Sequence, residues 1–471
     1  MSKILITGGG WAGCGAAVSA AKQGAEVTLI EKTDLLLGAG NVGGIMRNNG
    51  RFTATEENMA MGASELFEIT DQHAVHRNVD FPGHRHASFY DGQLVEPAVR
   101  RLLQDFGVTV HFCSRAVDVK WDFSAELAEK AVGKKIEAVE VMQDGAPIWM
   151  EADAFVEATG SSGPMGNCAK YGKGCAMCIQ RCPSFGPRVS LTARAGACDL
   201  TARRSGTDAA YNLGALSGSC KLEKKSLSSE LQARLSRDGF AVIPLPDSLI
   251  RRSKLSEKVC QQYALDTFAE NIILIDTGQA KLMTSYFNLE ELRTVAGFEK
   301  VTFLDPYAGG RGNSVRYMSV SEREDTMRAV GFTNLFLGGE KSGFFVGHTE
   351  AITTGSLAGY NAVRQTRQTT PTMQGLMSPD EGSSAELSAV LSPDGLLRLP
   401  RTLVCGELLA YAQEALQEED GLYRRFTFAG GEFFQRMEEM GLYTTDPEAV
   451  RNRVRDAGLL NIYNLPTALQ M

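Results

Sequence analysis

The chain has 471 residues, of which 43% are hydrophobic and 22% charged, and its formal net charge is −8. This length predicts two or three domains around a large core, and the acidic balance argues against a protein whose main role is to coat nucleic acid. No apolar run approaches the ~20 residues that span a bilayer, and the start lacks a secretory signal. We therefore expect a cytoplasmic protein without a membrane partner, whose ten cysteines serve metal binding or redox chemistry.

The first elements form a nucleotide-binding pattern. Lys3–Thr7 predicts a buried parallel strand, followed by the G-x-G-x-x-G run Gly8–Gly13, an alanine-rich helix and a strand that ends before Glu31. The glycines allow a tight turn, close approach to a pyrophosphate and close helix–strand packing. The helix N-terminus stabilises phosphate, and the acid can bind a ribose diol. The predicted dinucleotide contacts are Gly8, Gly10, Trp11, Ala12, Gly13, Glu31 and Lys32.

Further segments resemble the glutathione-reductase-like FAD proteins. A glycine-rich stretch, 35–50, follows the ribose-binding acid, one later strand ends in Ala158-Thr159-Gly160, and another ends in Gly339-Glu340, where that family usually has Gly-Asp. A helix opening with Gly347-His348-Thr349-Glu350 corresponds to the family's helix that points at the flavin. The resemblance implies FAD as cofactor, with further contacts at Gly40, Asn41, Val42, Val117, Ala158, Thr159, Gly160, Gly339, Glu340, Gly347, His348 and Thr349.

Two groups of flavoproteins are more closely similar. The opening fingerprint and segments 91–97 and 102–108 look like FAD-dependent oxidoreductases related to the heterodisulfide reductases. Segment 315–363 is similar to the tRNA-modifying flavoproteins of the glucose-inhibited division protein A group and the folate-dependent tRNA uracil methyltransferases. These resemblances imply an α/β fold: a three-layer, Rossmann-like FAD-binding domain with a mostly parallel sheet, an inserted α+β domain and a small helical C-terminal domain. They do not name a substrate.

A cysteine cluster follows the Gly160 turn. The spacing Cys168-x6-Cys175-x2-Cys178-x3-Cys182-Pro183 ends like a bacterial ferredoxin loop, although the first gap there is two residues. Four soft thiolates in one compact loop favour a [4Fe-4S] cluster. Zinc is the main alternative, since four thiolates suit it too, and an unmetallated redox loop is another. Cys198 or Cys220 could replace Cys168 as the fourth ligand.

Composition and periodicity predict how the chain is divided. The expected parts are a first FAD segment at 1–160, an inserted domain with the cysteine loop and a substrate face at 161–300, an FAD return segment at 301–365, a linker at 366–386 and a helical C-terminal domain at 387–471. Asp446 followed by Pro447 is typical of a helix start. No second nucleotide fingerprint stands out, because Gly309–Gly312 lacks the strand-then-helix context.

Because the sequence shows no nicotinamide domain, we expect the cluster to transfer electrons between the flavin and a one-electron carrier such as ferredoxin or flavodoxin. His348, Glu350 and Lys341 are candidate catalytic residues, because each could move a proton beside the flavin. Glu350 could instead cap its helix, and His348 could simply hydrogen-bond the flavin edge.

Three functions follow. The main hypothesis is an iron–sulfur flavoprotein oxidoreductase acting on a small molecule. The alternatives are a flavin-dependent RNA-modifying enzyme, with nucleic acid as a less favoured partner, and an electron-transfer subunit of a larger complex. The substrate, the direction of electron flow and the oligomeric state are left open.

Overall fold

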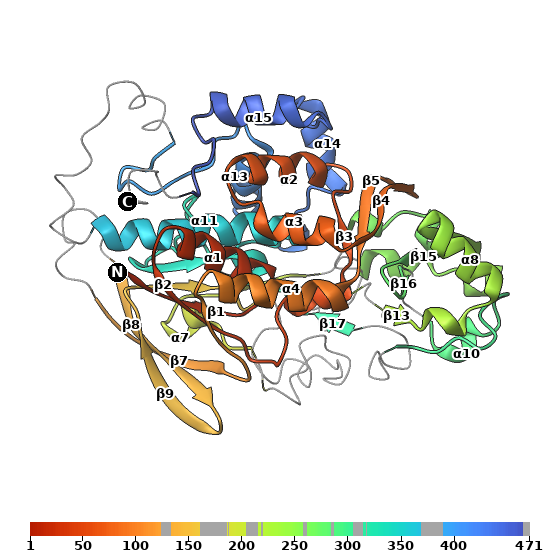
Figure 1. Ribbon diagram of the computed structural model, residues 1–471, viewed down its shortest axis with the longest axis horizontal. Coiled ribbons are helices and arrows are strands. Elements are labelled where there is room, and N and C mark those ends of the chain that lie inside the picture. The colour runs from red at the N-terminus through yellow and green to blue at the C-terminus, as the bar shows by residue number, and fades with distance from the viewer. Residues whose placement is uncertain are drawn as a thin grey trace.

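The computed structural model describes residues 1–123, 133–160, 186, 188–203, 215–217, 220–257, 261–283, 287–304, 314–316, 318–368 and 390–464. The molecule is longer than it is wide, with a lobe of antiparallel strands at one end and a three-stranded sheet at the other (Figure 1). Among the described residues, no helix is long and apolar enough to cross a membrane.

A five-stranded parallel sheet organises the main body. Its order is β19-β10-β1-β2-β6, and each neighbouring pair is parallel. The strands are β1 (Lys3–Thr7), β2 (Glu26–Ile30), β6 (Thr109–His111), β10 (Ala154–Glu157) and β19 (Leu335–Leu337). The residues of the three central strands are mostly buried, as expected for a sheet covered on both faces.

Alternate residues of these strands enter two different cores. Val156 and its neighbours pack under α1 (Trp11–Lys22), α11 (His348–Gln368) and α4 (Gly92–Asp105), whereas Phe155 and its neighbours face the antiparallel sheet β7-β8-β9. The strands of that sheet are β7 (Arg115–Phe123), β8 (Lys134–Gln143) and β9 (Ala146–Glu151). Helices on one face and a sheet on the other make three layers, which confirms the predicted Rossmann-like class.

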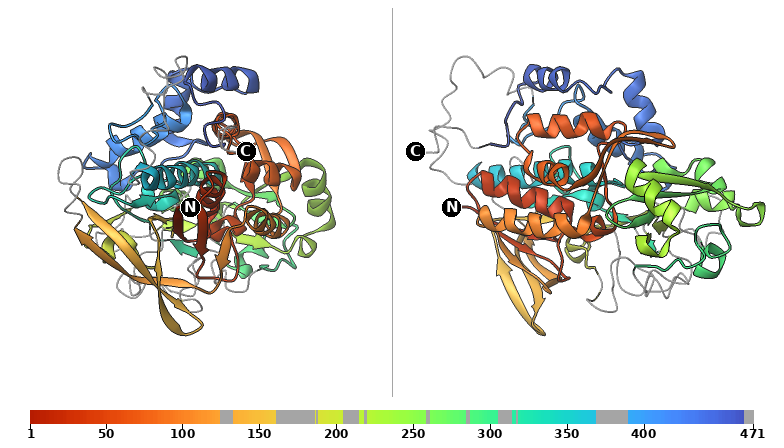
Figure 2. Two further views of the ribbon diagram at one scale, coloured as in Figure 1. Left: turned by 60° about the vertical axis from the view of Figure 1, so that its left-hand side comes forward. Right: turned by 45° about the vertical axis from the view of Figure 1, so that its right-hand side comes forward.

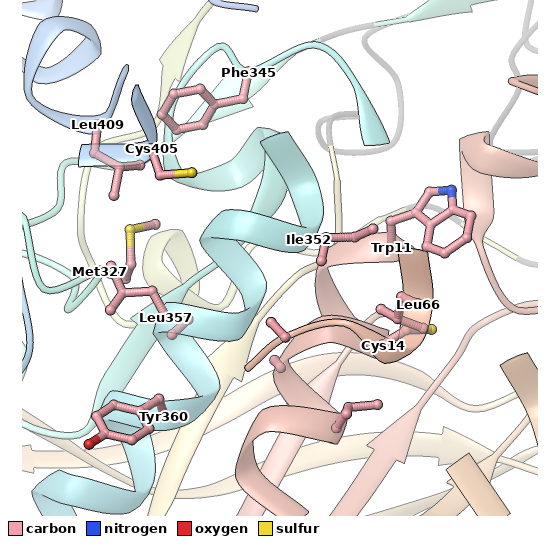
Figure 3. Packing of buried hydrophobic residues seen from close by; sticks show 14 of the residues in the cluster. Trp11, Cys14, Leu66, Met327, Phe345, Ile352, Leu357, Tyr360, Cys405 and Leu409 are labelled. Carbon is pink, nitrogen blue, oxygen red and sulfur yellow. The ribbon is translucent and has the colours of Figure 1, made fainter. Parts of the chain in front are cut away.

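The helices α1 and α11 lie unusually close because glycines form their contact. A Cβ on Gly355 would be 2.0 Å from the Ala12 carbonyl oxygen, and one on Gly359 would be 2.2 Å from that of Ala16. Because both numbers rise together along the two helices, α1 and α11 run parallel and begin at the same end of the sheet. In Figure 3, Ile352 lies between the two helices beside Trp11.

The second lobe is built on the antiparallel sheet β13-β16-β15-β14. One face packs against α8 (Ser229–Asp238) and α10 (Leu289–Leu292), and the other meets the sheet β3-β5-β4. The strands are β3 (Ile45–Met46), β4 (Ala74–Phe81), β5 (His84–Tyr90), β13 (Cys220–Leu222), β14 (Phe240–Pro244), β15 (Asn271–Asp276) and β16 (Ala280–Leu282). Figure 2 shows this lobe projecting from the end of the molecule away from β7–β9.

Short elements complete the described chain. Two small antiparallel pairs are β11 (Leu200–Thr201) with β18 (Ser319–Val320) and β12 (Ala215–Ser217) with β17 (Ser314–Arg316). The remaining α-helices before α11 are α2 (Arg51–Ala60), α3 (Glu65–Gln72), α7 (Leu191–Arg194) and α9 (Thr267–Glu270).

The C-terminal helices pack on the main body rather than standing apart. They are α13 (Val404–Leu416), α14 (Gly431–Glu439) and α15 (Pro447–Asp456), and α2 contacts both α13 and α15 (Figure 1). Asp446 caps α15 through the N–H groups of Glu448 and Ala449, with Pro447 at the first position. Buried residues of α13, such as Leu408, belong to the same core as α1 and α11.

Candidate flavin site

The turn between β1 and α1 is shaped by three glycines. Gly8 has a φ of +100°, and a Cβ there would lie 2.5 Å from the Ala158 carbonyl oxygen. A Cβ on Gly13 would lie 1.8 Å from the Gly8 carbonyl oxygen, whereas one on Gly10 would meet nothing within 4 Å. No side chain caps α1, whose N-cap is Gly10. The open space at an uncapped helix N-terminus fits a phosphate group.

Glu31 lies directly after β2 and is 6% exposed. Its Oε2 accepts a hydrogen bond from the Gly9 N–H at 2.7 Å, and its Oε1 accepts from the N–H and hydroxyl of Thr33 at 2.8 and 2.9 Å. A carboxylate has about four acceptor positions, so Glu31 keeps capacity for a ribose hydroxyl. The adjacent Lys32 donates to the Gly186 carbonyl oxygen at 3.4 Å.

Val117 lies near the expected adenosine end of this site. It falls at a bulge in β7, where the pairing with β8 shifts between Ala116 and Asp118. The residues that lead into β7 return to the acid, because the Ser114 N–H donates to the Glu31 carbonyl oxygen at 2.9 Å. The structure thus joins the residue before β7, three positions ahead of Val117, to Glu31.

A glycine loop joins the N-termini of the two parallel helices. It contains the 3-10 helix η1 (Gly38–Val42), and the Asn41 side chain closes it by donating to the Leu36 carbonyl oxygen at 2.6 Å. A Cβ on Gly40 would lie 2.3 Å from Trp11 Nε1, and one on Gly43 would lie 2.0 Å from His348 Cε1. The loop expected to contact the flavin therefore lies against the first residue of α1 and the first of α11.

The Gly8–Gly13 turn, the glycine loop and the first residue of α11 together form a cradle. Trp11 places an unused hydrogen-bond donor in this cradle. The side chain is 3% exposed, and its buried Nε1–H has no hydrogen-bond partner among the residues that the structure describes. A buried donor left unpaired costs about 1–3 kcal/mol. An orphaned donor beside a glycine loop and an uncapped helix fits a ligand with acceptor atoms, as FAD has along its pyrophosphate and ring edge.

His348 is held by a tyrosine that sequence reasoning missed. The Tyr90 hydroxyl lies 2.8 Å from His348 Nδ1, and Tyr90 is fully buried. Burial raises the pKa of Tyr90 above its ordinary range, so the phenol keeps its proton and can donate it to Nδ1. In that arrangement Nδ1 is the acceptor, and a neutral ring carries its proton on Nε2. No sequence motif marked Tyr90, which is the last residue of β5.

Glu350 is completely buried in an ion-pair network. Its carboxylate accepts from Arg51 Nε at 3.1 Å, from the Thr427 hydroxyl at 2.7 Å and from the Phe428 N–H at 2.9 Å. These partners come from α2 and the C-terminal segment. The side chain thus joins α11 to two other elements instead of facing the glycine loop. Gly347 lies against the same network, since a Cβ there would be 2.0 Å from Glu350 Oε2.

Lys341 is also fully buried, on the side of the sheet that faces β7–β9. Its Nζ donates to Asp199 Oδ1 at 2.7 Å and to the Ser190 hydroxyl at 2.8 Å, and it lies 3.9 Å from Glu157 Oε1. Burial lowers the pKa of Lys341 below its usual value. Lys341 and Glu350, both predicted to be catalytic, are therefore in separate buried clusters, and only His348 borders the glycine loop.

The remaining predicted flavin contacts cluster at the ends of β10 and β19. The Gly339 N–H donates to the Thr354 hydroxyl at 2.8 Å, so α11 holds the turn that follows β19. Glu340 is half-buried in that turn, within η10 (Gly339–Ser342), and Thr349 is fully buried beside Met46. Ala158, Thr159 and Gly160 follow β10 and adjoin the Gly8 turn.

The predicted cluster ligands Cys168, Cys175, Cys178 and Cys182 lie outside the described residues. Cys198 is described and exposed. Within the described ranges, no group of three or more His, Cys, Asp or Glu side chains is arranged to hold a metal.

Both ends of the cysteine segment are anchored beside the flavin site. Gly160 follows the end of β10, and after the cysteines Arg188 returns to the same place. Arg188 Nε donates to the Thr159 hydroxyl at 2.9 Å, and its Nη2 is 3.6 Å from Glu157 Oε1. The described residues on either side of the cysteines, Thr159 and Arg188, therefore meet at the carboxyl edge of the parallel sheet.

The parallel sheet and the glycine-lined turn give this chain the fold of a Rossmann-like FAD-binding domain. The model of the family described as FAD dependent oxidoreductase matches residues 3–167, and that of Glucose inhibited division protein A matches residues 276–370. The first of these two models covers about a third of the chain. A comparison with curated proteins gave no significant match.

Solved structures of GidA from Aquifex aeolicus have the same fold. The form II crystal structure gives a TM-score of 0.60 at 15% identity and covers 98% of this chain and 74% of that chain. The form I structure gives 0.59 at 13% identity, with 98% and 76% covered.

Proposed function

We propose that the protein is an iron–sulfur flavoenzyme. In this proposal the cysteines at 168–182 bind a [4Fe-4S] cluster, which passes single electrons between a carrier such as ferredoxin or flavodoxin and FAD, and the flavin site acts on a small molecule. The observation that carries the proposal is the hydrogen bond between Thr159 and Arg188, because these residues come before and after the cysteines in sequence and meet beside the flavin site. A donor set of four thiolates suits a cubane.

The chain's own residues would bind and orient FAD. Gly10 and the N-terminus of α1 would hold the pyrophosphate, Glu31 the ribose, and Trp11 Nε1 an acceptor atom. The parallel helix α11 directs a second positive end to the same region, where it favours negative charge. When bound, FAD supplies electron exchange in ones or twos, which no side chain provides.

His348 is the residue best positioned to move a proton in this site. The hydrogen bond with Tyr90 fixes the ring, and when Tyr90 is the donor, the ring proton lies on Nε2, 2.3 Å from where a Gly43 Cβ would be. The ring edge therefore lies against the flavin loop, where Nε2–H can be given to a reacting group and later regained.

A flavin-dependent RNA-modifying enzyme is the second candidate. It is supported by the match of residues 276–370 to the Glucose inhibited division protein A model and by the resemblance of that segment to tRNA-modifying flavoproteins. Such an enzyme would bind transfer RNA, and the affinity would fall steeply with salt. The net charge of −8 favours the first candidate.

The deciding experiment is anaerobic purification followed by measurement of the visible spectrum and of iron, sulfide, zinc and flavin per chain. The proposal expects about one flavin with about four iron and four sulfide. Cys178→Ser should lose the iron and keep the flavin, whereas Cys113→Ser, an exposed cysteine outside the cluster motif, should lose neither.

Zinc in place of iron, with flavin retained, would refute the electron relay. The cysteine segment would then be a structural staple, and salt-dependent binding of transfer RNA would become the next measurement.

A further inference from the structure

Two lysines are direct neighbours on the sheet of the second lobe. In the antiparallel pair β13–β16, Lys221 stands opposite Lys281, while the flanking pairs Cys220–Leu282 and Leu222–Ala280 alternate with them. Ala280 and Leu282 are buried toward α8 and α10. Both lysines therefore point to the other face, toward the main body. Like charges directly opposite one another destabilise a sheet, so this pair calls for an explanation.

Burial makes the closeness of the two positively charged lysines more destabilising. Lys281 is only 5% exposed and donates from Nζ to the Gly43 carbonyl oxygen at 2.6 Å. Lys221 is half-buried and makes no ion pair with any residue that the structure describes. Burial lowers the pKa of Lys221, and the nearby carboxylate of Asp91 only partly opposes this. Asp91 already accepts from the Gln93 N–H as the N-cap of α4.

The lysine pair lies next to the flavin loop. Gly43 is the link, because its carbonyl oxygen accepts from Lys281 while its Cα faces the His348 ring. The next residue, Gly44, lies against the second lobe as well, since a Cβ there would be 2.6 Å from the Thr277 methyl group. Thus one short loop separates a pair of ammonium groups from the histidine at the start of α11.

We propose that Lys221 and Lys281 bind an anionic group of the substrate, a carboxylate or a phosphate, and hold it against the Gly43 loop beside the flavin. An anion beside the two ammonium groups relieves their repulsion, and it can accept a charge-assisted hydrogen bond from Lys221, which has no ion-pair partner among the described residues. The inference rests on the proposed function only in treating the bound anion as part of the substrate.

The size of the cluster favours a small anion over a nucleic acid. Proteins that bind nucleic acid typically neutralise on the order of 6–10 phosphates, whereas this site offers two adjacent lysines, one of them buried, on an acidic chain. Lysine acts as a point charge, which suits a single carboxylate or phosphate.

The test is anion binding to the holoprotein, followed through the visible absorption band of the flavin, with inorganic phosphate and acetate as probes. Lys221→Met should weaken the tighter probe at least about tenfold, as expected for loss of one charge-assisted hydrogen bond. Lys221→Arg should restore most of the affinity, and Lys225→Met, which removes an exposed charge four residues away, should leave it unchanged.

Equal affinities in wild type and Lys221→Met, or no saturable response of the wild type to either probe, would overturn the proposal. Loss of FAD from Lys221→Met would overturn it too, because the lysines would then serve the cofactor; Lys221→Gln provides a second variant should the methionine variant not fold. Since no turnover or iron is needed, these results stand apart from those that test the iron–sulfur cluster.

Discussion

Substitutions at single glycines of the first turn should affect the stability of the fold and the binding of the cofactor separately. Gly10→Ala adds a methyl group to open space at a φ of −67°, which alanine tolerates, so we expect the apoprotein to keep its stability within about 1 kcal/mol. The same methyl group occupies the expected phosphate position and should weaken FAD at least about tenfold. Thermal denaturation of the apoprotein and FAD titration by fluorescence measure the two effects.

Gly13→Ala is the matched contrast, because its Cβ would lie 1.8 Å from the Gly8 carbonyl oxygen. We expect it to destabilise the apoprotein itself by about 2 kcal/mol or more. If Gly10→Ala bound FAD as tightly as wild type, the pyrophosphate would not lie at the start of α1.

At the scale of elements, α2 supplies the cap that α13 lacks. The N-cap of α13, Leu403, offers no side-chain hydrogen bond, and the N–H groups of Val404 and Cys405 instead donate to the Glu57 carboxylate, each at 2.9 Å. Burial raises the pKa of Glu57 from 4.5 to about 7, although these N–H groups and Arg453 oppose it. The folded protein therefore holds one more proton than the unfolded chain between these pH values.

This proton gives the stability a predictable pH dependence. The contribution of Glu57 is fully present below about pH 4.5 and is lost as pH rises through about 7. Between about pH 5 and pH 8, the unfolding free energy of wild type should fall by up to about 3 kcal/mol relative to Glu57→Gln. Urea denaturation of both proteins measures this, and the exposed Glu419→Gln serves as control. An unchanged difference would mean that Glu57 is ionised throughout.

Local sequence patterns predicted the secondary-structure elements better than they predicted the tertiary contacts between those elements. The parallel strands, the Gly8–Gly13 turn and the capped helix after Asp446 each follow from a few adjacent residues, and the structure has them where the sequence indicates. The helix α11, in contrast, runs to Gln368, beyond the expected return segment. The partners of His348 and Glu350 lie 258 and 299 positions away, at Tyr90 and Arg51. No spacing within one segment reveals such pairs, because tertiary packing alone brings them together.

For the whole molecule, one continuous core predicts that FAD stabilises distant helices. Residues of α1, α11 and α13 belong to the same buried cluster, whereas the sheet β14–β15 of the second lobe lies in others. At free FAD about 100-fold above its Kd, the gain should be about 2.7 kcal/mol. Hydrogen exchange should show added protection in α13 as well as α1, and less in β14. Protection limited to α1 would mean that the C-terminal helices open independently.

The tight glycine contact between α1 and α11 also determines when, during synthesis of the chain, FAD can bind. Ala12 and Gly355 come together in the finished protein although some 340 residues separate them along the chain. At about 5–20 residues per second, a ribosome needs roughly 20–70 s to make that stretch. Until α11 has been made, the nucleotide-binding turn lacks the helix that packs against α1 and is exposed to solvent and chaperones. FAD loading is therefore an event of the nearly complete or released polypeptide, and a truncated product that ends before α11 cannot retain the cofactor.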